Sequence, residues 1–213
     1  MPQSNKIWIF PVDNDDIIPE MTGKVYQQNH RDIILKFLKD RGCKFRNCCD
    51  IGAHIGIWSS DFVKHFEWVH AFEPIAELRL CYEKNITQSN YTLYPFGLGN
   101  FNQEVQFQYN PEHSKNTQVN PAGNYTAQIR RLDDFNLSNI DYIKMDAEAY
   151  ELEILKGANI LLKIQSPIVH LEMKSKALSQ FNLTKQDVRD WLSKLGYKQV
   201  LKIANEFVFV KDV

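Results

Sequence analysis

The sequence CDIGAHIG at residues 49–56, followed by HAFEP at residues 70–74, decides how this chain is expected to fold. A short apolar strand runs into a glycine turn, and residues 57–66 then carry helical spacing. A second strand over residues 68–72 ends on Glu73. An acidic residue at the tip of the second strand, about 20 residues after a glycine turn, is well placed to hold the two hydroxyl groups of a ribose. The stretch therefore predicts a nucleoside-binding α/β half-fold.

The glycine turn favours one kind of nucleoside ligand. A dinucleotide site needs the pattern Gly-x-Gly-x-x-Gly, because the pyrophosphate requires room beside the helix N–H groups. Here Gly52 and Gly56 allow a close approach of the backbone. His54 stands where the middle glycine would be, and Asp50 disfavours a phosphate. A ligand with a ribose, an ammonium group and no phosphate fits better, which indicates S-adenosylmethionine. A dinucleotide, or a tight turn without a ligand, stays open as an alternative at this point.

The residues expected to contact this cofactor come from the ends of three strands. Glu73 would hold the ribose, and Asp50 would hold the amino acid part. A third strand over residues 91–96 ends at Gly97-Leu98-Gly99, where small residues would let a flat adenine lie against the backbone or would simply form a turn. The full predicted set is Asp50, Gly52, Ala53, His54, Gly56, Glu73, Pro74, Gly97 and Leu98.

The composition is that of an ordinary globular protein. The chain has 213 residues, of which 44% are hydrophobic and 24% charged, which suits one domain with a sizeable core. A formal net charge of -1 without a long basic run argues against a nucleic acid partner. No apolar stretch approaches the roughly 20 residues that span a bilayer, and we expect neither a signal peptide nor a membrane partner. Four cysteines without a Cys-x-x-Cys pair predict reduced thiols, a cytoplasmic location and no zinc site.

Strands and helices alternate along the rest of the chain. Residues 7–10 predict an edge strand and residues 27–39 a helix, which together form an N-terminal cap over residues 1–44. Residues 45–213 are expected to form a doubly wound, mostly parallel sheet. The sheet ends in an antiparallel hairpin, because only Ala204-Asn205 separates the last two strands. The whole chain is thus predicted to be a single α/β domain.

The middle of the chain carries further elements. Residues 104–109 and 125–131 read as strands, and residues 149–162 read as a helix. Between the two strands, residues 110–124 are polar and rich in Asn, Pro, Ser and Thr. Such a segment is either the place where acceptor specificity resides or a plain surface loop.

Polar side chains lie at the ends of two further strands, at the same edge of the predicted sheet. Asp146 and Glu148 follow the apolar strand over residues 140–145, and His170 and Glu172 end the next strand. In each pair, side chains two residues apart point to one side of an extended backbone. All four are candidates for the base that removes a proton from an acceptor, with Asp146 the first choice. The two carboxylates after the first strand could also bind a metal or steer a sulfonium, although no metal ligand is assigned, and His170 could be a structural histidine.

Three stretches together resemble the FkbM-type S-adenosylmethionine-dependent methyltransferases. They are DIGAHIG at residues 50–56, AFEP at residues 71–74, and RLDDF at residues 131–135 with IDYIKMDAE at residues 140–148, Glu151 and LKGA at residues 155–158 beyond it. The resemblance covers residues 47–172. It implies a Rossmann-like class I methyltransferase fold, S-adenosylmethionine as the cofactor, and methyl transfer to a hydroxyl oxygen of a sugar or another small metabolite.

The chain departs from the pattern of this family at two positions. The family usually has Asn where this chain has His54, and Gly where it has Ala149. An alanine there is strained if the backbone requires a positive φ. Three other functions stay open: a non-catalytic protein that kept the cofactor fold, a dinucleotide-dependent oxidoreductase and, more weakly, an enzyme that methylates amino groups of nucleic acid bases.

Overall fold

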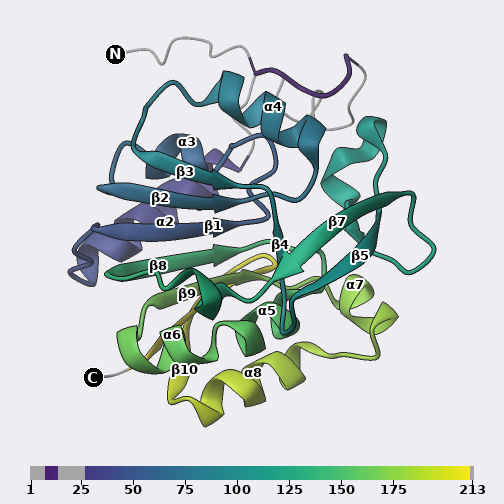
Figure 1. The fold of residues 1–213 in the computed structure, drawn as a ribbon. Helices are drawn as coiled ribbons and strands as arrows, with labels where there is room; N and C mark the ends of the chain where they lie inside the picture. The colour runs from purple at the N-terminus through teal and green to yellow at the C-terminus, as the bar shows by residue number, and fades with distance from the viewer. Residues whose placement is uncertain (1–7, 14–26, 212–213) are drawn as a thin grey trace.

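The computed structural model describes residues 8–13 and 27–211. In this part of the chain, seven strands form one sheet with helices on both faces, and four short strands form a second sheet beside it (Figure 1). The strands of the main sheet are, in spatial order, β10 (Tyr197–Ile203), β11 (Glu206–Lys211), β9 (Ile168–Glu172), β8 (Ile140–Met145), β1 (Asn47–Ile51), β2 (Trp68–Phe72) and β3 (Tyr91–Tyr94). All neighbouring pairs are parallel except the two that β11 makes. This arrangement confirms the predicted α/β fold with a C-terminal antiparallel hairpin.

The order of the strands changes direction between β1 and β8. From β1 the chain continues outward through β2 to β3, and it then returns to β8 on the other side of β1. In open α/β sheets, ligands bind at such a switch point, outside the carboxyl ends of the strands. The residues that follow β1, β2, β8 and β9 therefore meet at one edge of the main sheet.

Helices pack their apolar sides on both faces of the main sheet (Figure 1). The helices on one face are α2 (Gln28–Asp40), α3 (Ser59–Phe62) and α4 (Ala76–Asn85). The helices that contribute to the core on the other face are α5 (Glu151–Gly157), α6 (Asn159–Gln165), α7 (Ser175–Gln180) and α8 (Lys185–Lys194). Helix α8 begins with a capping box between Thr184 and Asp187, in which each residue satisfies a backbone N–H group of the other.

The second sheet covers the carboxyl edge of the main one. Its strands are, in spatial order, β4 (Gly97–Leu98), β7 (Tyr125–Arg130), β5 (Gln103–Gln108) and β6 (Gln118–Val119). The 3-10 turn η1 (Pro111–Asn116) lies between β5 and β6, and a second one, η2 (Leu132–Phe135), follows β7. Phe107 and Ile129 of this sheet pack with Ile57, after the glycine turn, and Leu78 of α4. The second sheet is therefore anchored beside the switch point.

Two of the expected elements differ in the structure. Residues 8–10 form no strand, because Asn85 takes the backbone bonds that a neighbouring strand would make: its amide accepts from the N–H of Ile9 at 2.8 Å and donates to the carbonyl of Ile9 at 2.9 Å. Residue 7 lies outside the described residues. The helix expected over residues 57–66 is regular only in α3. Before α3, the carbonyl of Ile57 accepts from the hydroxyl of Ser60, and the N–H of Asp61 donates to Trp58 instead.

The helix expected over residues 149–162 is broken into α5 and α6. The break follows Gly157, where a Cβ atom would lie 1.9 Å from the carbonyl oxygen of Gly99. The next residue, Ala158, has φ −108° and ψ 11°, outside the helical region. The backbone just after β4 thus lies so close to Gly157 that only glycine fits at this position of the helix.

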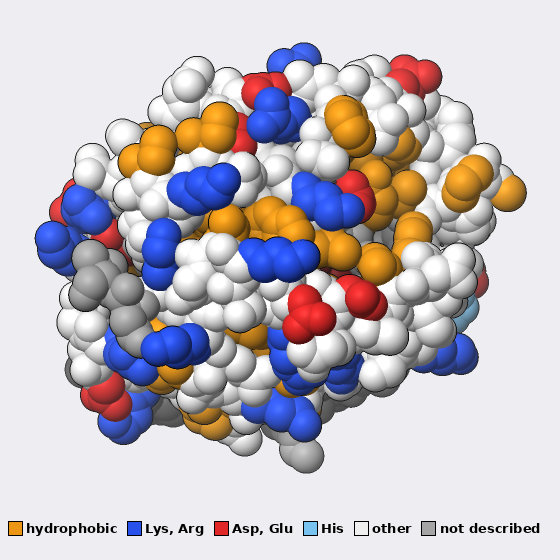
Figure 2. All heavy atoms as spheres, turned by 90° about the horizontal axis from the view of Figure 1, so that it is seen from below, with side chains coloured by type: hydrophobic (Ala, Val, Ile, Leu, Met, Phe, Trp, Pro, Cys, Tyr) orange, Lys and Arg blue, Asp and Glu red, His pale blue; other side chains and the backbone are white. Residues whose placement is uncertain are grey.

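The face that α6 and α8 cover is rich in lysine and arginine side chains, with apolar side chains between them (Figure 2). On α6, Ile160 and Ile164 are 53% and 77% exposed.

Among residues 8–13 and 27–211, no helix combines the length and the apolar character needed to cross a bilayer.

Candidate active site

A cavity of about 410 Å³ lies at the carboxyl edge of the main sheet. Residues that follow β1, β2, β8 and β9 form part of its wall, and residues of the second sheet, η1, α4 and α5 contribute further parts. The lining combines apolar side chains, such as Leu78, Phe107 and Ile129, with several acidic ones. Such a mixture of apolar surface and a few convergent polar groups is typical of a small-molecule site.

The glycine turn after β1 forms one side of the cavity. Gly52 has φ 72° and His54 has φ 53°, so both adopt the left-handed conformation. The backbone N–H of His54 donates to Oε2 of Glu73 at 2.9 Å, and its ring Nε2 lies 2.8 Å from Oγ of Ser114 in η1. The side chain of His54, which replaces the middle glycine of a dinucleotide pattern, therefore connects the glycine turn to η1.

Glu73 follows β2 and is only 4% exposed. Its two carboxylate oxygens accept from the backbone N–H groups of Ile75 and His54, both at 2.9 Å. Burial raises the pKa of this carboxyl to about 7, and the two N–H groups oppose that rise. Each oxygen keeps a second lone pair, so the residue can accept two further hydrogen bonds from a diol in the cavity.

Seven of the nine predicted cofactor residues line the cavity: Gly52, Ala53, His54, Glu73, Pro74, Gly97 and Leu98. Gly56 does not, and its φ of 90° serves packing, because a Cβ atom there would lie 3.0 Å from side-chain atoms of Ile86 and Tyr82. Asp50 does not reach the cavity either. It is fully buried in β1, where the hydroxyl of Ser59 donates to its Oδ2 at 2.6 Å.

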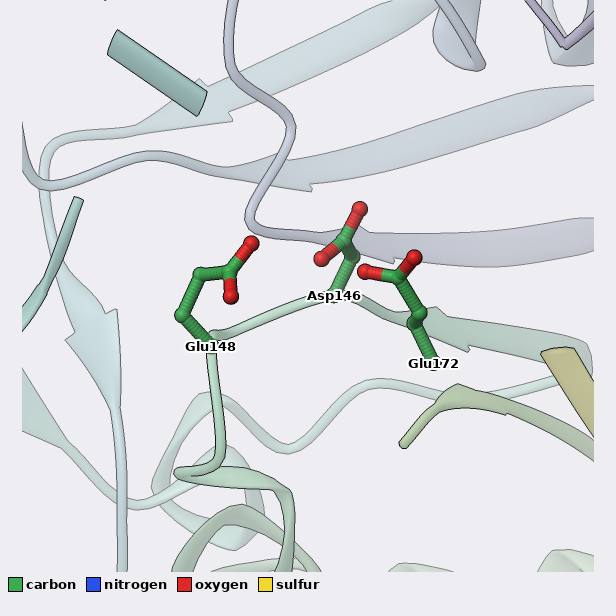
Figure 3. A group of neighbouring side chains, drawn as sticks. All are labelled: Asp146, Glu148 and Glu172. Carbon is green, nitrogen blue, oxygen red and sulfur yellow. The ribbon is translucent and has the colours of Figure 1, made fainter. Parts of the chain in front are cut away.

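Three acidic side chains form a group, here called the acidic cluster, that consists of Asp146, Glu148 and Glu172 (Figure 3). One carboxylate oxygen of each lies within 4.8 Å of the other two. The parallel pairing of β8 with β9 brings them together, because Asp146 and Glu148 follow one strand and Glu172 ends the other. All three line the cavity.

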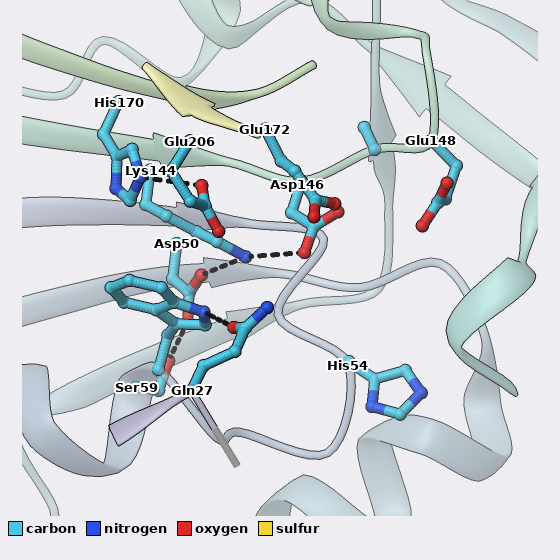
Figure 4. A network of polar contacts seen from close by, with 12 residues as sticks. Gln27, Asp50, His54, Ser59, Lys144, Asp146, Glu148, His170, Glu172 and Glu206 are labelled. Atoms are coloured by element: carbon cyan, nitrogen blue, oxygen red, sulfur yellow. Dashed lines mark hydrogen bonds and ion pairs between the residues drawn. The ribbon is translucent and has the colours of Figure 1, made fainter. Parts of the chain in front are cut away.

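Two lysines that the sequence analysis did not single out, Lys144 and Lys174, supply positive charge to the acidic cluster, and Figure 4 shows Lys144 beside Asp146. Nζ of Lys174 donates to Oε1 of Glu148 at 2.6 Å and lies 2.8 Å from Oε2 of Glu172. Lys144 lies in β8 with its Nζ 3.5 Å from Oδ2 of Asp146, and it is only 2% exposed. A lysine inside an apolar strand is the signal that could have revealed it, because a buried lysine needs a partner.

The lysines set the charges of the cluster. Burial alone would raise the pKa of Asp146, but Lys144 and Lys174 outweigh burial and lower it to about 2. Burial and the charge of Asp146 raise the pKa of Glu172 to about 9. Burial, with Asp146, also raises the pKa of Glu148. At neutral pH the cluster therefore holds an ionised Asp146 beside a protonated Glu172.

His170 does not line the cavity, contrary to its prediction as a candidate base. It is fully buried in β9, with its Nδ1 2.6 Å from the hydroxyl of Tyr142 and its Nε2 2.8 Å from Oε2 of Glu206. The antiparallel strand β11 brings Glu206 to this position. The arrangement agrees with the alternative reading of a structural histidine.

Other lining residues carried no clear signal in the sequence. The indole of Trp58 donates to Oε1 of Gln27 at 2.9 Å, and both residues line the cavity. Residues 114–117, in the polar segment between β5 and β7, line it as well. The sequence allows this segment to be either a loop that determines acceptor specificity or a plain surface loop. The structure places residues 114–117 of it against the cavity.

Residues 50–198 match the sequence model of the methyltransferase FkbM domain. The chain belongs to the FkbM methyltransferase family. No curated protein matches it. One position at which this FkbM sequence departs from the family pattern, Ala149, has φ 78°, and Glu148 before it has φ 47°. The backbone here adopts the left-handed conformation in which a glycine is unstrained and an alanine is not.

Solved methyltransferases share the fold of this FkbM-family chain. The methyltransferase FkbM from Methylobacillus flagellatus superimposes with a TM-score of 0.59 at 21% identity, over 78% of this chain and 43% of that protein. Magnesium protoporphyrin IX methyltransferase from Synechocystis, solved with bound S-adenosylmethionine, gives a TM-score of 0.55 at 12% identity, over 87% and 80% of the two chains. The N-methyltransferase NodS from Bradyrhizobium japonicum gives 0.55 at 10% identity, over 88% and 97%. These likenesses establish the class I methyltransferase fold, and the chain spans less than half the length of the first protein.

The residues present in this FkbM chain fit the cofactor that its fold implies. Glu73 keeps lone pairs free for a ribose, and apolar side chains of α4 and the second sheet line the same cavity. The acidic cluster has the oxygen donors that a hard metal ion prefers. Because the ammonium groups of Lys144 and Lys174 already lie against these carboxylates, we assign no metal to them.

Proposed function

We propose that this FkbM-family protein transfers a methyl group from S-adenosylmethionine to a hydroxyl oxygen of a small polyhydroxylated metabolite such as a sugar. The observation that carries the proposal is that one cavity is lined by both Glu73 and the acidic cluster. When bound, S-adenosylmethionine supplies a methyl group on a positively charged sulfur atom. The chain supplies acceptors for the ribose hydroxyls and, in the same cavity, acceptors for the hydroxyl groups of a second molecule.

The residues that would hold the cofactor divide by chemistry. Glu73 accepts the ribose hydroxyls while its position is fixed by the two backbone N–H groups. Leu78, Phe107 and Ile129 offer an apolar surface suited to a flat base. The second sheet walls this part of the cavity with apolar side chains, such as Phe107 and Ile129.

An alcohol is a poor nucleophile, so a base must help to remove its proton. The raised pKa of Glu148 supports this residue as the proton acceptor, because burial and the charge of Asp146 make it a stronger base than an ordinary carboxylate. Asp146, the first choice from the sequence, keeps its charge down to a pH of about 2 and suits a role in orienting the hydroxyl. Glu172 carries the proton of the pair at neutral pH and can donate a hydrogen bond.

The cysteines support a reducing, cytoplasmic setting for this reaction. Cys43, Cys48, Cys49 and Cys81 are all free, and three of them are buried. Burial raises the pKa of the Cys43 thiol to about 11, which keeps even the less buried one protonated.

The cofactor part of the proposal is tested by calorimetry with S-adenosylmethionine and S-adenosylhomocysteine, with NAD as the control. We expect the two sulfur compounds to bind and NAD not to bind. Binding of NAD alone would overturn the proposal in favour of an oxidoreductase.

The catalytic part is tested by release of S-adenosylhomocysteine with a panel of sugars and other polyols. We expect E148Q to lose activity at unchanged cofactor affinity, because its position in the cavity is kept and only the base is removed. E153Q, on α5 outside the cavity, is the matched control. A protein that binds the cofactor and turns over none of the polyols would instead be a non-catalytic binder or a methyltransferase for another acceptor class.

A further inference from the structure

A row of alternating charges leads from the interior of the main sheet to the acidic cluster (Figure 4). Asp50 of β1 and Lys144 of β8 are direct partners in the parallel ladder. Nζ of Lys144 lies 3.8 Å from Oδ1 of Asp50 and 3.5 Å from Oδ2 of Asp146. The ammonium therefore lies between one carboxylate that is fully buried and one that lines the cavity.

Asp50 is the deepest member of this row, with no exposed surface. Ser59 satisfies its Oδ2, but its Oδ1 has no hydrogen-bond partner among the described residues. A buried carboxylate is costly unless a charge or a donor compensates it. Within the described part of the chain, the ammonium of Lys144 is the cation that faces this oxygen. Asp50 is thus placed to hold Lys144 and is not placed to touch a ligand.

Lys144 is surrounded by acids from every strand that packs against it. Besides Asp50 and Asp146, the carboxyl groups of Glu206 in β11 and Glu172 in β9 act on it, and the ring of Trp58 lies 5.6 Å from its Nζ. Burial would lower the pKa of Lys144, yet the surrounding acids raise it. The surrounding carboxylates therefore favour the charged ammonium of Lys144.

Asp146 needs that charge because it competes with Glu148 and Glu172 for protons. Carboxyl groups this close cannot all ionise, and the one nearest to a fixed cation keeps its charge. Lys174 contacts Glu148 and Glu172, whereas Lys144 is the cation in contact with Asp146. Lys174 also lowers the pKa of Asp146 from a greater distance, but Lys144 is the cation in direct contact with this carboxylate.

We propose that Lys144 is a positioning residue that keeps Asp146 ionised and directed into the cavity, and that Asp50 is the buried anchor that fixes Lys144. The inference rests on the proposed methyl transfer for its role in the reaction. Its electrostatic content depends on this chain alone and is measurable without a cofactor or an acceptor.

The first test follows the carboxyl carbon of Asp146 by NMR in protein labelled at aspartate, with D146N to identify the signal. In the wild type and in K144R, which keeps the positive charge, we expect the signal of the ionised form throughout pH 4 to 7. In K144M we expect a titration within that range, which is a gain in proton affinity of about a hundredfold or more. An Asp146 that stays ionised throughout this range in K144M would overturn the proposal.

The second test measures the coupling of Asp50 to Lys144 through urea unfolding. K144M leaves Asp50 buried and unpaired, whereas the double variant D50N/K144M removes both charges. We expect the double variant to unfold at a higher urea concentration than K144M, and independent effects of the two substitutions would refute the anchor role. If K144M does not fold, D50N/K144M takes its place in the titration.

A third test separates this inference from the proposed function. We expect D50N to bind S-adenosylhomocysteine within about threefold of the wild type, because Asp50 does not line the cavity. If D50N loses tenfold or more of the affinity for S-adenosylhomocysteine, Asp50 contributes to the cofactor site after all. Failure of the wild type to bind would refute the proposed function and would leave the titration result standing.

Discussion

A Cβ atom on Gly52 would lie 1.9 Å from the carbonyl oxygen of Asp146. The glycine turn after β1 and the acidic segment after β8 therefore touch backbone to backbone, where the two central strands end. Gly52 also has φ 72°, so both the space and the conformation require glycine. The contact sets how the turn that leads to His54 lies relative to the acidic cluster.

We expect G52A to destabilise the protein by about 3 kcal/mol or more, because the methyl group must push the two segments apart in addition to the left-handed strain. The matched control is G42A, since Gly42 has φ 70° and no atom within 4 Å of an added Cβ. It should lose only about 1–2 kcal/mol from strain. Urea unfolding measures both, and equal losses would show that the contact with Asp146 does not matter.

Substitution of Glu73 should weaken cofactor binding. A hydrogen bond to a charged group contributes about 1.5–3 kcal/mol, so loss of the charge in E73Q should reduce the affinity for S-adenosylhomocysteine at least about tenfold. E83Q, an exposed position on α4, is the control and should bind like the wild type. Calorimetry at pH 8 gives both affinities. Equal affinity in E73Q would remove Glu73 from the site.

The same residue should make binding depend on pH. The pKa of Glu73 is raised to about 7, so the carboxyl takes up a proton as the pH falls below 7 and loses one of its acceptor oxygens. We expect the affinity for S-adenosylhomocysteine to fall as the pH is lowered from 8 to 6, by up to about tenfold per unit below 7. E73Q cannot titrate, and its affinity should vary less over that range. A flat profile in the wild type would contradict the assignment.

Glu151 should reduce stability at high pH. It is 1% exposed, its Oε1 accepts from the N–H of Ala147 at 2.9 Å, and burial raises its pKa to about 7 from 4.5. Because the folded state binds the proton more tightly, the free energy of unfolding falls as the pH rises from about 4.5 to 7. E151Q escapes this loss.

We therefore expect E151Q and the wild type to be alike near pH 4.5, and E151Q to be more stable at pH 8 by about 2–3 kcal/mol. Urea unfolding at both pH values measures the difference, in which the similar contribution of Glu73 cancels. A constant difference at both values would show that Glu151 does not titrate in this window.

Replacing Ala149 by glycine should stabilise the chain. Its φ of 78° strains an alanine by about 1–2 kcal/mol, which a glycine avoids. A glycine also makes the unfolded chain more flexible, which offsets part of this stabilisation. We expect A149G to gain about 0.5–1 kcal/mol in thermal or urea unfolding. The control A158G, at φ −108° in the core, should be less stable than the wild type. Loss of stability in A149G would show that the methyl group matters more than the strain.

The sequence predicted the features that depend on neighbouring residues. The strand over residues 140–145 and the hairpin around Ala204-Asn205 appear as expected. The acidic cluster also followed from local pattern, because each of its members comes at the end of a parallel strand. Such features are determined by short stretches of sequence, through the alternation of apolar side chains and the residues that form turns.

Features that depend on contacts between distant segments escaped prediction. Alternation showed that residues 104–109 form a strand, but nothing in the pattern revealed that its partners belong to a separate sheet. The break after Gly157 comes from the backbone of Gly99, which lies far away in the sequence. Lys174 could not be recognised because its partner Glu148 comes from another strand end.

The second sheet has a consequence for how this protein can evolve. Its strands hydrogen-bond to one another and not to the main sheet, and the chain leaves the main sheet after β3 and returns at β8. Insertions or replacements between Gly97 and Arg130 therefore leave the ladder of the seven strands intact, while they change Phe107, residues 114–117 and Ile129 in the wall of the cavity. Substitutions in that wall can therefore alter the cavity without changing a backbone hydrogen bond of the sheet that carries the acidic cluster.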